Sequence, residues 1–448
     1  MSKLSFFGAA GEVTGSSFLL TADDLSEILI DFGMFQGAPE QVSKNYAALD
    51  FNAASLKAVF ITHAHLDHSG RLPLLIYGGF KGKVYMTEPT RALVEVILTD
   101  SARIAEKDMT KEPLYTMEEV DKILQMIQIV QYDQVISVGA FTVTFRDAGH
   151  ILGSSSIEIT DTSGDTPKKF VFSGDLGNTP QDIMNPTRYI DSADIVVMES
   201  TYGDKNHPKE DVIGIIQEEI NAIEENGGVL LIPSFAIERT QELLHRIHHM
   251  KAEGKIGATL PVFLDSPMGS HVTQIYREYA SFCNDEIHKH IDDPYVFDGL
   301  RVTDESYESK KIMNVPGAKV IIAGSGMMSG GRIMHHSENY LSFPNTRILF
   351  VGYQAEETMG RAILEGAKNV AINNETVPVK AKIREIETLS SHADQQKLLT
   401  WLGHIKGVKK VFLLHGEPEQ RETLKSKITT ELGLSDITLP EKGSEHSV

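Results

Sequence analysis

Short apolar runs of strand length, separated by glycine- or aspartate-containing turns, fill most of the first half of the chain. They predict strands at residues 4–7, 17–21, 27–31, 58–62, 135–137, 141–145, 155–160, 170–173 and 195–198. Residues 89–107 carry apolar side chains at helical spacing after a proline, which predicts a helix. Because side chains at strand ends converge at one rim of a sheet, we expect an active site to be assembled there.

From about residue 211 onward, helices and strands alternate. This pattern predicts a parallel sheet covered by helices, with strands at 229–232, 262–264, 319–323 and 347–351 and helices at 212–224, 239–251 and 269–280. Residues 283–315 are more polar, and we expect them to be rich in loops. The chain then returns to strands at 381–386 and 411–414 and helices at 393–402 and 417–432. The predicted fold class is α/β.

The composition indicates a folded chain of more than one domain. With 448 residues, 41% hydrophobic and 23% charged, two packed domains are expected. No apolar run approaches the ~20 residues of a membrane helix, and the N-terminus lacks the features of a signal peptide, so we expect a cytoplasmic protein without a membrane partner. The single cysteine, Cys283, excludes a thiolate zinc site, so any metal must be held by His, Asp and Glu.

The net charge limits the kinds of partner. Forty-two basic against 62 acidic residues give −20, which argues against diffuse coating by nucleic acid but leaves room for a local positive cleft. A carboxylate-rich chain also attracts divalent cations, so the charge is compatible with a metalloenzyme.

The strongest chemical signal directly follows the predicted strand 58–62 and reads His63-Ala64-His65-Leu66-Asp67-His68. Alternate positions share one side of the chain as it leaves the strand, so four metal-capable groups fall close together. That density suits two metal ions. Imidazole and carboxylate ligands favour Zn²⁺, with Mn²⁺ an option where oxygen ligands dominate. A polar loop is the weaker interpretation, since chance seldom produces this spacing even with 17 histidines.

Three further metal-capable residues follow other predicted strands, each beside a glycine that lets the backbone approach a ligand: His150, Asp175 and His415. Each alone could be a turn aspartate or a surface histidine. Together they would complete a dinuclear centre.

The whole set resembles the metallo-β-lactamase superfamily. Three more segments look like signatures of its β-CASP branch of RNA and DNA nucleases: Glu199-Ser200-Thr201-Tyr202-Gly203, Ser391-His392-Ala393-Asp394 and Leu414-His415-Gly416-Glu417. Within that branch the chain resembles prokaryotic homologues of the pre-mRNA cleavage endonuclease subunit. The resemblance implies an αββα sandwich of residues 1–203 and 367–448. It also implies an inserted α/β β-CASP domain, residues 204–366, that acts as a lid.

The resemblance also implies roles for the individual ligands. One zinc would be bound by His63, His65 and His150 and the other by Asp67, His68 and His415, with Asp175 bridging both. Asp31 would be a carboxylate that fixes the ligands from behind.

Phosphodiester hydrolysis is the natural use of such a centre, because two metals can activate a hydroxide and hold a phosphate oxygen. His392 is our candidate for protonating the leaving 3′-oxygen, and Glu199 would hold its ring and favour the protonated form. The alternative interpretation is that His392 is a surface residue at the start of a helix, without a catalytic role.

Two segments of the inserted domain are candidates for binding backbone phosphates. One contains Ser234 and Arg239, and the other is the glycine-rich loop with Ser325, Gly326 and Met327. Arg332 just beyond could contact the same groove, although surface polarity explains it about as well. A plain glycine-rich connection is the alternative for the loop.

We therefore expect a zinc-dependent ribonuclease acting on single-stranded RNA. Two alternatives are a small-molecule ester or thioester hydrolase with the same metal fold and a non-catalytic RNA-binding subunit. The long insertion and the His392–Glu199 pair count against the first, and the intact ligand set counts against the second. The sequence leaves open endonuclease against 5′–3′ exonuclease action, RNA against DNA, and the oligomeric state, including a homodimer.

Overall fold

The computed structural model describes residues 2–108, 112–178, 183–288, 293–355 and 357–448. The chain forms two compact units. The sandwich unit comprises Met1–Asn206 and His392–Val448, and the inserted unit comprises His207–Ser391. The second boundary lies after residue 391, where the sequence suggested 366, because β19 (Lys382–Glu385) pairs in parallel with a strand of the inserted unit.

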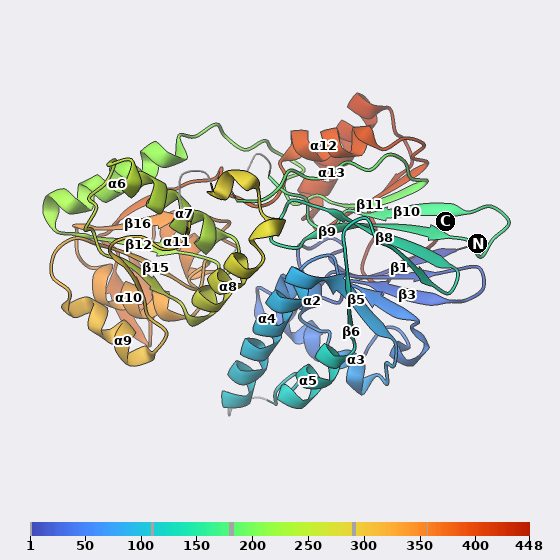
Figure 1. Ribbon diagram of the computed structural model, residues 1–448, viewed down its shortest axis with the longest axis horizontal. Helices are drawn as coiled ribbons and strands as arrows, with labels where there is room; N and C mark the ends of the chain where they lie inside the picture. Colours follow the sequence, from blue (N-terminus) through green and yellow to red (C-terminus); the bar gives the residue numbers. More distant parts are fainter. Residues whose placement is uncertain (1, 109–111, 179–182, 289–292, 356) are drawn as a thin grey trace. The chain divides into compact units, whose positions relative to one another are not determined.

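Two seven-stranded sheets form the centre of the sandwich unit (Figure 1). The first has the order β22-β1-β2-β3-β4-β5-β6, with β22 Glu445–Ser447, β1 Lys3–Gly8, β2 Ser17–Thr21, β3 Glu27–Ile30, β4 Ala58–Phe60, β5 Lys83–Thr87 and β6 Ile127–Val130. The second has the order β21-β20-β11-β10-β9-β8-β7, with β21 Ile437–Thr438, β20 Lys410–Leu414, β11 Ile195–Glu199, β10 Lys168–Phe172, β9 Ser155–Asp161, β8 Phe141–Asp147 and β7 Val135–Val138.

Aromatic side chains from both sheets meet in one core. Phe18 of β2 packs on Phe172 of β10 with ring centroids 6.2 Å apart, and Phe6 of β1 packs on Phe412 of β20 at 5.1 Å. Burial alternates along β8 as the period of a strand requires, so each second side chain enters this core.

Helices cover the outer faces of the two sheets (Figure 1). The α12 and α13 helices, Gln395–His404 and Pro418–Lys427, bury Leu398, Trp401 and Leu424 with apolar residues of β10, β11 and β20. The α4 helix, Glu88–Lys107, packs on β5 and β6 and begins at Thr87, whose hydroxyl caps it. Shorter helices are α1 Pro39–Ser43, α2 Leu66–Ser69, α3 Leu74–Tyr77 and α5 Met117–Gln125. The predicted αββα layering is confirmed.

The inserted unit is built on a six-stranded sheet whose paired strands all run parallel. Its order is β14-β13-β15-β12-β16-β19, with β14 Leu300–Val302, β13 Val262–Asp265, β15 Lys319–Ala323, β12 Val229–Pro233 and β16 Thr346–Phe350. Parallel strands bring their carboxyl ends to one edge, so the loops that follow β12, β15 and β16 are neighbours there.

Helices flank this sheet (Figure 1). They are α6 Val212–Asn226, α7 Arg239–Ala252, α8 Pro267–Glu278, α9 Ser306–Lys311, α10 Arg332–Tyr340 and α11 Met359–Leu364, with a hairpin of β17 Asn369–Ile372 and β18 Glu375–Pro378. The stretch 283–315, expected to be mainly loop, includes β14 and α9. Both are short, so their apolar periodicity is weak. Among the described residues, no helix has the length and apolarity to cross a lipid bilayer.

Candidate metal centre

The metal-capable side chains that the sequence predicts come together at strand ends of the sandwich unit. Each follows the carboxyl end of β4, β8, β10 or β20, or lies on the α2 turn after β4. Their ligand atoms form overlapping groups within 4.8 Å, whose members are His63, His65, His150 and Asp175; Asp67, His68 and His415; and Asp175, His392 and His415. Asp67 and His415, 348 residues apart in the chain, thus lie together at one place.

The first group is a compact cage of three imidazole nitrogens and one carboxylate oxygen. His65 Nδ1 lies 3.1 Å from His63 Nε2 and 3.2 Å from His150 Nε2. Asp175 Oδ2 lies 3.5 Å from His63 Nε2 and 3.6 Å from His150 Nε2. A tetrahedral zinc with bonds of about 2.0–2.1 Å has ligands about 3.3–3.4 Å apart. The spacing therefore fits tetrahedral coordination.

The second group faces the other oxygen of the same carboxylate. Asp175 Oδ1 lies 3.3 Å from His68 Nε2 and 3.8 Å from His415 Nε2, and Asp67 Oδ2 lies 3.3 Å from His415 Nε2. Asp175 therefore presents one oxygen to each group. That is the arrangement of a bridging ligand.

The burial and hydrogen bonding of the Asp175 carboxylate also fit a bound cation. Asp175 Oδ1 is buried and accepts no hydrogen bond from any described residue, although such an atom is costly to leave without a partner. A cavity of about 20 Å³ borders Asp175, and its lining combines Asp31, His68, Glu199 and His415 with apolar core residues such as Phe18 and Phe172. That is room for about one water-sized sphere.

Burial and mutual charge set the protonation of the cluster. Burial lowers the pKa of His65 to about 4, and burial with the charge of His68 holds the pKa of His63 well below its usual range. Burial alone would raise the pKa of Asp175, but the surrounding imidazoles, His415 and His68 foremost, hold it well below its usual value. Neutral imidazole and ionised carboxylate are the forms that bind metals.

Asp31 supports the cluster from behind and lies outside the ligand groups themselves. Its Oδ1 accepts from the backbone N–H of Thr62 and its Oδ2 from the Thr62 hydroxyl, both at 2.8 Å, while His68 Nδ1 donates to Oδ2 at 2.8 Å. This orients the His68 ring so that Nε2 points at Asp175. Asp31 and His415 both have positive φ, 56° and 49°, a strained backbone typical of functional sites.

His392 lies beside the cluster and is paired with Glu199. Its Nδ1 lies 3.3 Å from Glu199 Oε2 and 3.9 Å from Asp175 Oδ2. The Leu176 N–H donates to Glu199 Oε1 at 2.6 Å, and the Leu176 carbonyl accepts from Ala393, so one residue fixes both partners. Burial alone would lower the pKa of His392, but the carboxylates of Glu199 and Asp175 outweigh it and raise that pKa to about 9.

The site also contains two threonines, Thr62 and Thr201, which the sequence analysis did not identify as site residues. The Thr62 hydroxyl lies 3.1 Å from His63 Nδ1 while it binds Asp31, and the Thr201 hydroxyl lies 3.0 Å from His415 Nδ1. Both follow strand ends, directly before the histidine motif and within the Glu199 segment. Their position next to those motifs was the available signal.

The phosphate candidates lie in the inserted unit. Ser325, Gly326 and Met327 form the loop after β15, with Ser325 and Met327 partly exposed. Ser234 and Arg239 are instead buried. The Ser234 hydroxyl lies 3.0 Å from that of Thr240.

The two predicted phosphate-binding arginines have partners within the inserted unit. The Arg239 guanidinium pairs with Glu242, and Arg332 donates to Asp265 and to the Thr303 and Asp304 carbonyls. The structure therefore supports a scaffolding role for both, in place of direct contact with phosphate. The reason is that each guanidinium group already has a carboxylate partner. Glu242 lies three residues from Arg239 in the sequence, and Asp265 lies 67 residues from Arg332.

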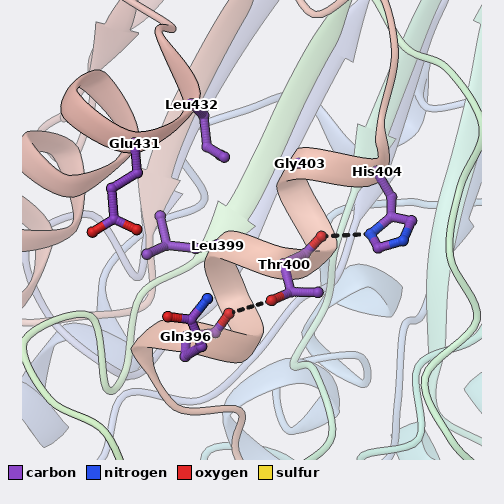
Figure 2. Close-up of a pocket in the computed structure, with 7 residues that line it drawn as sticks. All are labelled: Gln396, Leu399, Thr400, Gly403, His404, Glu431 and Leu432. Atoms are coloured by element: carbon purple, nitrogen blue, oxygen red, sulfur yellow. Dashed lines mark hydrogen bonds between the residues drawn. The ribbon is translucent and has the colours of Figure 1, made fainter.

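A second cavity, of about 330 Å³, lies elsewhere on the sandwich unit (Figure 2). It lies between α12 and the π-helix Ile428–Leu432 and is lined by Gln396, Leu399, Thr400, Gly403, His404, Glu431 and Leu432. None of the residues in the three groups of metal-capable side chains lines it. The carbonyl of Thr400 binds His404 Nδ1 at 2.7 Å, so this histidine belongs to the helix surface.

Comparison with known proteins gives three family matches in succession along the chain. They are a metallo-beta-lactamase superfamily domain at residues 19–199, a Beta-Casp domain at 240–363, and a Zn-dependent metallo-hydrolase RNA specificity domain at 376–440.

Similar curated proteins match most of the chain. Ribonuclease TTHA0252 of Thermus thermophilus is 37% identical over 418 residues, 92% of this chain and 93% of that protein. RNase aCSPSF2 of Saccharolobus solfataricus is 31% identical over 450 residues, 99% and 85%. Transcription termination factor FttA of Methanosarcina mazei is 31% identical over 453 residues, 98% and 70%.

A solved structure shares the fold. It is a protein of unknown function from Enterococcus faecalis V583, with a TM-score of 0.54 at 13% identity and 99% of each chain covered.

Proposed function

The chain belongs to the β-CASP branch of the metallo-β-lactamase superfamily, and from this premise we propose that it is a zinc-dependent ribonuclease that hydrolyses phosphodiester bonds of single-stranded RNA. The observation that carries the proposal is Asp175, which presents one oxygen to each of two ligand groups beside the His392–Glu199 pair. The ribonucleases among its relatives and the RNA specificity match support RNA as the substrate.

Two zinc ions fit the ligand atoms. His63, His65 and His150 would hold one, Asp67, His68 and His415 the other, and Asp175 both. Bound zinc supplies a positive charge for the phosphate and lowers the pKa of a bound water. Mn²⁺ fits less well than Zn²⁺ because nitrogen donors outnumber oxygen donors in the first group. Asp31 keeps the His68 ring oriented.

The residues around the cluster would perform the proton transfer. We assign His392 as the acid that protonates the leaving 3′-oxygen, because its ring borders the cluster and its side chain is 20% exposed, which gives substrate access. Glu199 is buried, accepts at Oε1 from Leu176 and faces Nδ1 of His392 with Oε2. It therefore fixes the ring and favours its charged form.

Backbone phosphates would bind at the glycine-rich loop of Ser325, Gly326 and Met327. Glycine allows close approach of a phosphate to backbone N–H groups, and the loop follows the carboxyl end of a central parallel strand, the usual position for an anion site. Ser234, Arg239 and Arg332 would act behind this loop through their contacts within the unit. Endonuclease or 5′–3′ exonuclease action, a homodimer and a cytoplasmic location remain predictions from the sequence.

RNA labelled at the 5′ or the 3′ end tests the proposal directly. We expect purified protein to cut it, and the His392→Ala and Asp175→Ala variants to lose most activity. His404→Ala, a surface histidine on α12, is the matched control. Equal activity in all four proteins would reject the assignments. Hydrolysis of small thioesters with no cleavage of RNA would favour the small-molecule alternative, and binding without cleavage would favour the non-catalytic one. The position of the retained label separates internal cutting from end trimming.

A further inference from the structure

Phe235 is an aromatic side chain that the inserted unit holds at its surface. It follows β12, and 38% of it is exposed, whereas Phe263 of β13 and Phe350 of β16 in the same sheet are buried. Its ring lies directly on the glycine-rich loop. A Cβ atom added to Gly326 would lie 2.7 Å from two ring carbons, closer than atoms can approach, so only glycine permits this contact.

The buried side-chain amide of Gln354 joins the two loops that support the Phe235 ring. Gln354, 3% exposed, donates from Nε2 to the Gly326 carbonyl at 3.0 Å and to the Gly352 carbonyl at 2.9 Å. Gly352 also borders the ring, since a Cβ atom there would lie 3.4 Å from it. The loops after β15 and β16 are therefore joined beneath the Phe235 ring.

Hydrogen bonds also fix the backbone at Phe235. Its carbonyl accepts from the Thr240 hydroxyl at 2.7 Å and from the Ser234 hydroxyl at 3.2 Å. The preceding N–H, of Ser234, donates to Ala323 at the end of β15 at 3.0 Å. A fixed aromatic ring loses little conformational freedom when a ligand stacks on it.

We propose that Phe235 is a stacking platform for one base of single-stranded RNA, whose adjoining phosphate binds the loop of Ser325, Gly326 and Met327. This inference rests on the proposed function and adds to it a base-binding subsite. Aromatic rings beside phosphate-binding backbone are how proteins hold single strands without reading sequence. Phenylalanine offers no hydrogen bond to a base edge, so the subsite accepts any base. Tyr353, which follows Gly352 on the loop after β16, is a second exposed aromatic residue, 46% exposed.

Steady-state cleavage of a short RNA by wild type and Phe235→Leu tests the inference. Leucine keeps an apolar side chain over Gly326 but removes the π face. We expect its KM to rise about tenfold with kcat little changed, because the base is not a reacting group. Phe235→Tyr and Phe235→Trp should retain the wild-type KM. Tyr307→Leu, which removes another exposed aromatic of this unit, is the matched control.

A set of RNAs with one abasic nucleotide at each position in turn locates the contact. For wild type, one position should raise KM about as much as Phe235→Leu does, and the variant should lose nothing more on that RNA. The inference is overturned if no abasic position raises the wild-type KM, a result that needs no folded variant. It is also overturned if the KM of Phe235→Leu equals that of wild type on intact RNA. The same holds if the KM of the variant exceeds that of wild type by the same factor on every abasic RNA. Wild type that cuts no RNA overturns the proposed function, and this inference with it.

Discussion

Replacement of His392 by asparagine should slow cleavage of RNA far more than cleavage of an activated ester. His392 Nδ1 lies 3.3 Å from Glu199, and the ring lies beside the cluster in one group with Asp175 and His415. We assign it to neither zinc. Asparagine keeps polarity at the position but has no acidic proton for the leaving oxygen. The change therefore removes a proton donor and leaves the cluster in place.

The size of the effect follows from the assigned role. A positioned general acid contributes about 10²–10⁴-fold, or about 3–5 kcal/mol, so kcat on RNA should fall by that factor. The kcat of Glu199→Gln on RNA should fall by less than that of His392→Asn. At 3.3 Å and an effective dielectric constant of about 20, the attraction of Glu199 for the imidazolium is about 5 kcal/mol before solvation losses. Asp175, 3.9 Å away, still supports that charge in the variant.

The assay compares two substrates that differ in the leaving group. One is an RNA dinucleotide, whose sugar oxygen needs a proton to leave, and the other is a phosphodiester whose nitrophenolate leaves without one. We expect His392→Asn to be impaired on RNA and near wild type on the nitrophenyl ester, with unchanged zinc content. Equal losses on both substrates would refute the acid role and indicate that His392 supports the cluster instead. His404→Asn is the control.

Three further results are expected. Asp175→Asn should hold less than half the wild-type zinc by elemental analysis and lose at least about 10²-fold in activity, since the amide is uncharged and keeps only one of the two oxygens that face the ligand groups; full zinc and full activity would contradict the bridging role. A chelator should abolish activity, with recovery on adding Zn²⁺ but not Mg²⁺, whose preference is for oxygen ligands; recovery with Mg²⁺ alone would contradict the zinc assignment. Asp265→Asn should lower the free energy of unfolding in urea by about 3–5 kcal/mol, because Asp265 is buried and bound by Thr303, Ser309, Arg332 and His336. Burial opposes ionisation of Asp265, but these bonds hold its pKa below the ordinary 3.8, so its stabilisation is complete above that pH and is lost as pH falls below it; a difference from wild type that stays constant down to pH ~3 would contradict this.

The ligand positions were predictable because they depend on local pattern. An apolar run that ends in a histidine or aspartate marks a strand exit, and this is where His63, His150, Asp175 and His415 lie, the last three beside glycine. Such a pattern needs no knowledge of distant contacts. The pattern fails for elements of mixed character, such as β5, in which three of five residues are buried, and the polar β22, which pairs with β1.

The direction of a long polar side chain was not predictable in the same way. Arg332 follows the glycine-rich loop, and proximity to that loop suggested a phosphate contact. Its partner Asp265 lies 67 residues earlier, at the end of β13, and only the parallel pairing of β13 with β15 brings the two together. The exposed Phe235 escaped notice for the complementary reason. A single aromatic residue after a buried strand indicates core, and only the glycines beneath it show that the ring remains outside.

The energetics of the cluster point to a cation as part of the folded state. Asp175 is almost fully buried, and its Oδ1 accepts no hydrogen bond from the described residues, a loss of several kcal/mol if nothing else compensates it. Burial lowers the pKa of His63 and His65, so these two imidazoles bring no charge, whereas the carboxylates near His68 and His392 raise the pKa of both. Structural zinc contributes about 10–16 kcal/mol in small domains, more than enough to offset that loss. A bound cation would supply the partner that Asp175 Oδ1 lacks among the described residues, as expected for a metal-binding site.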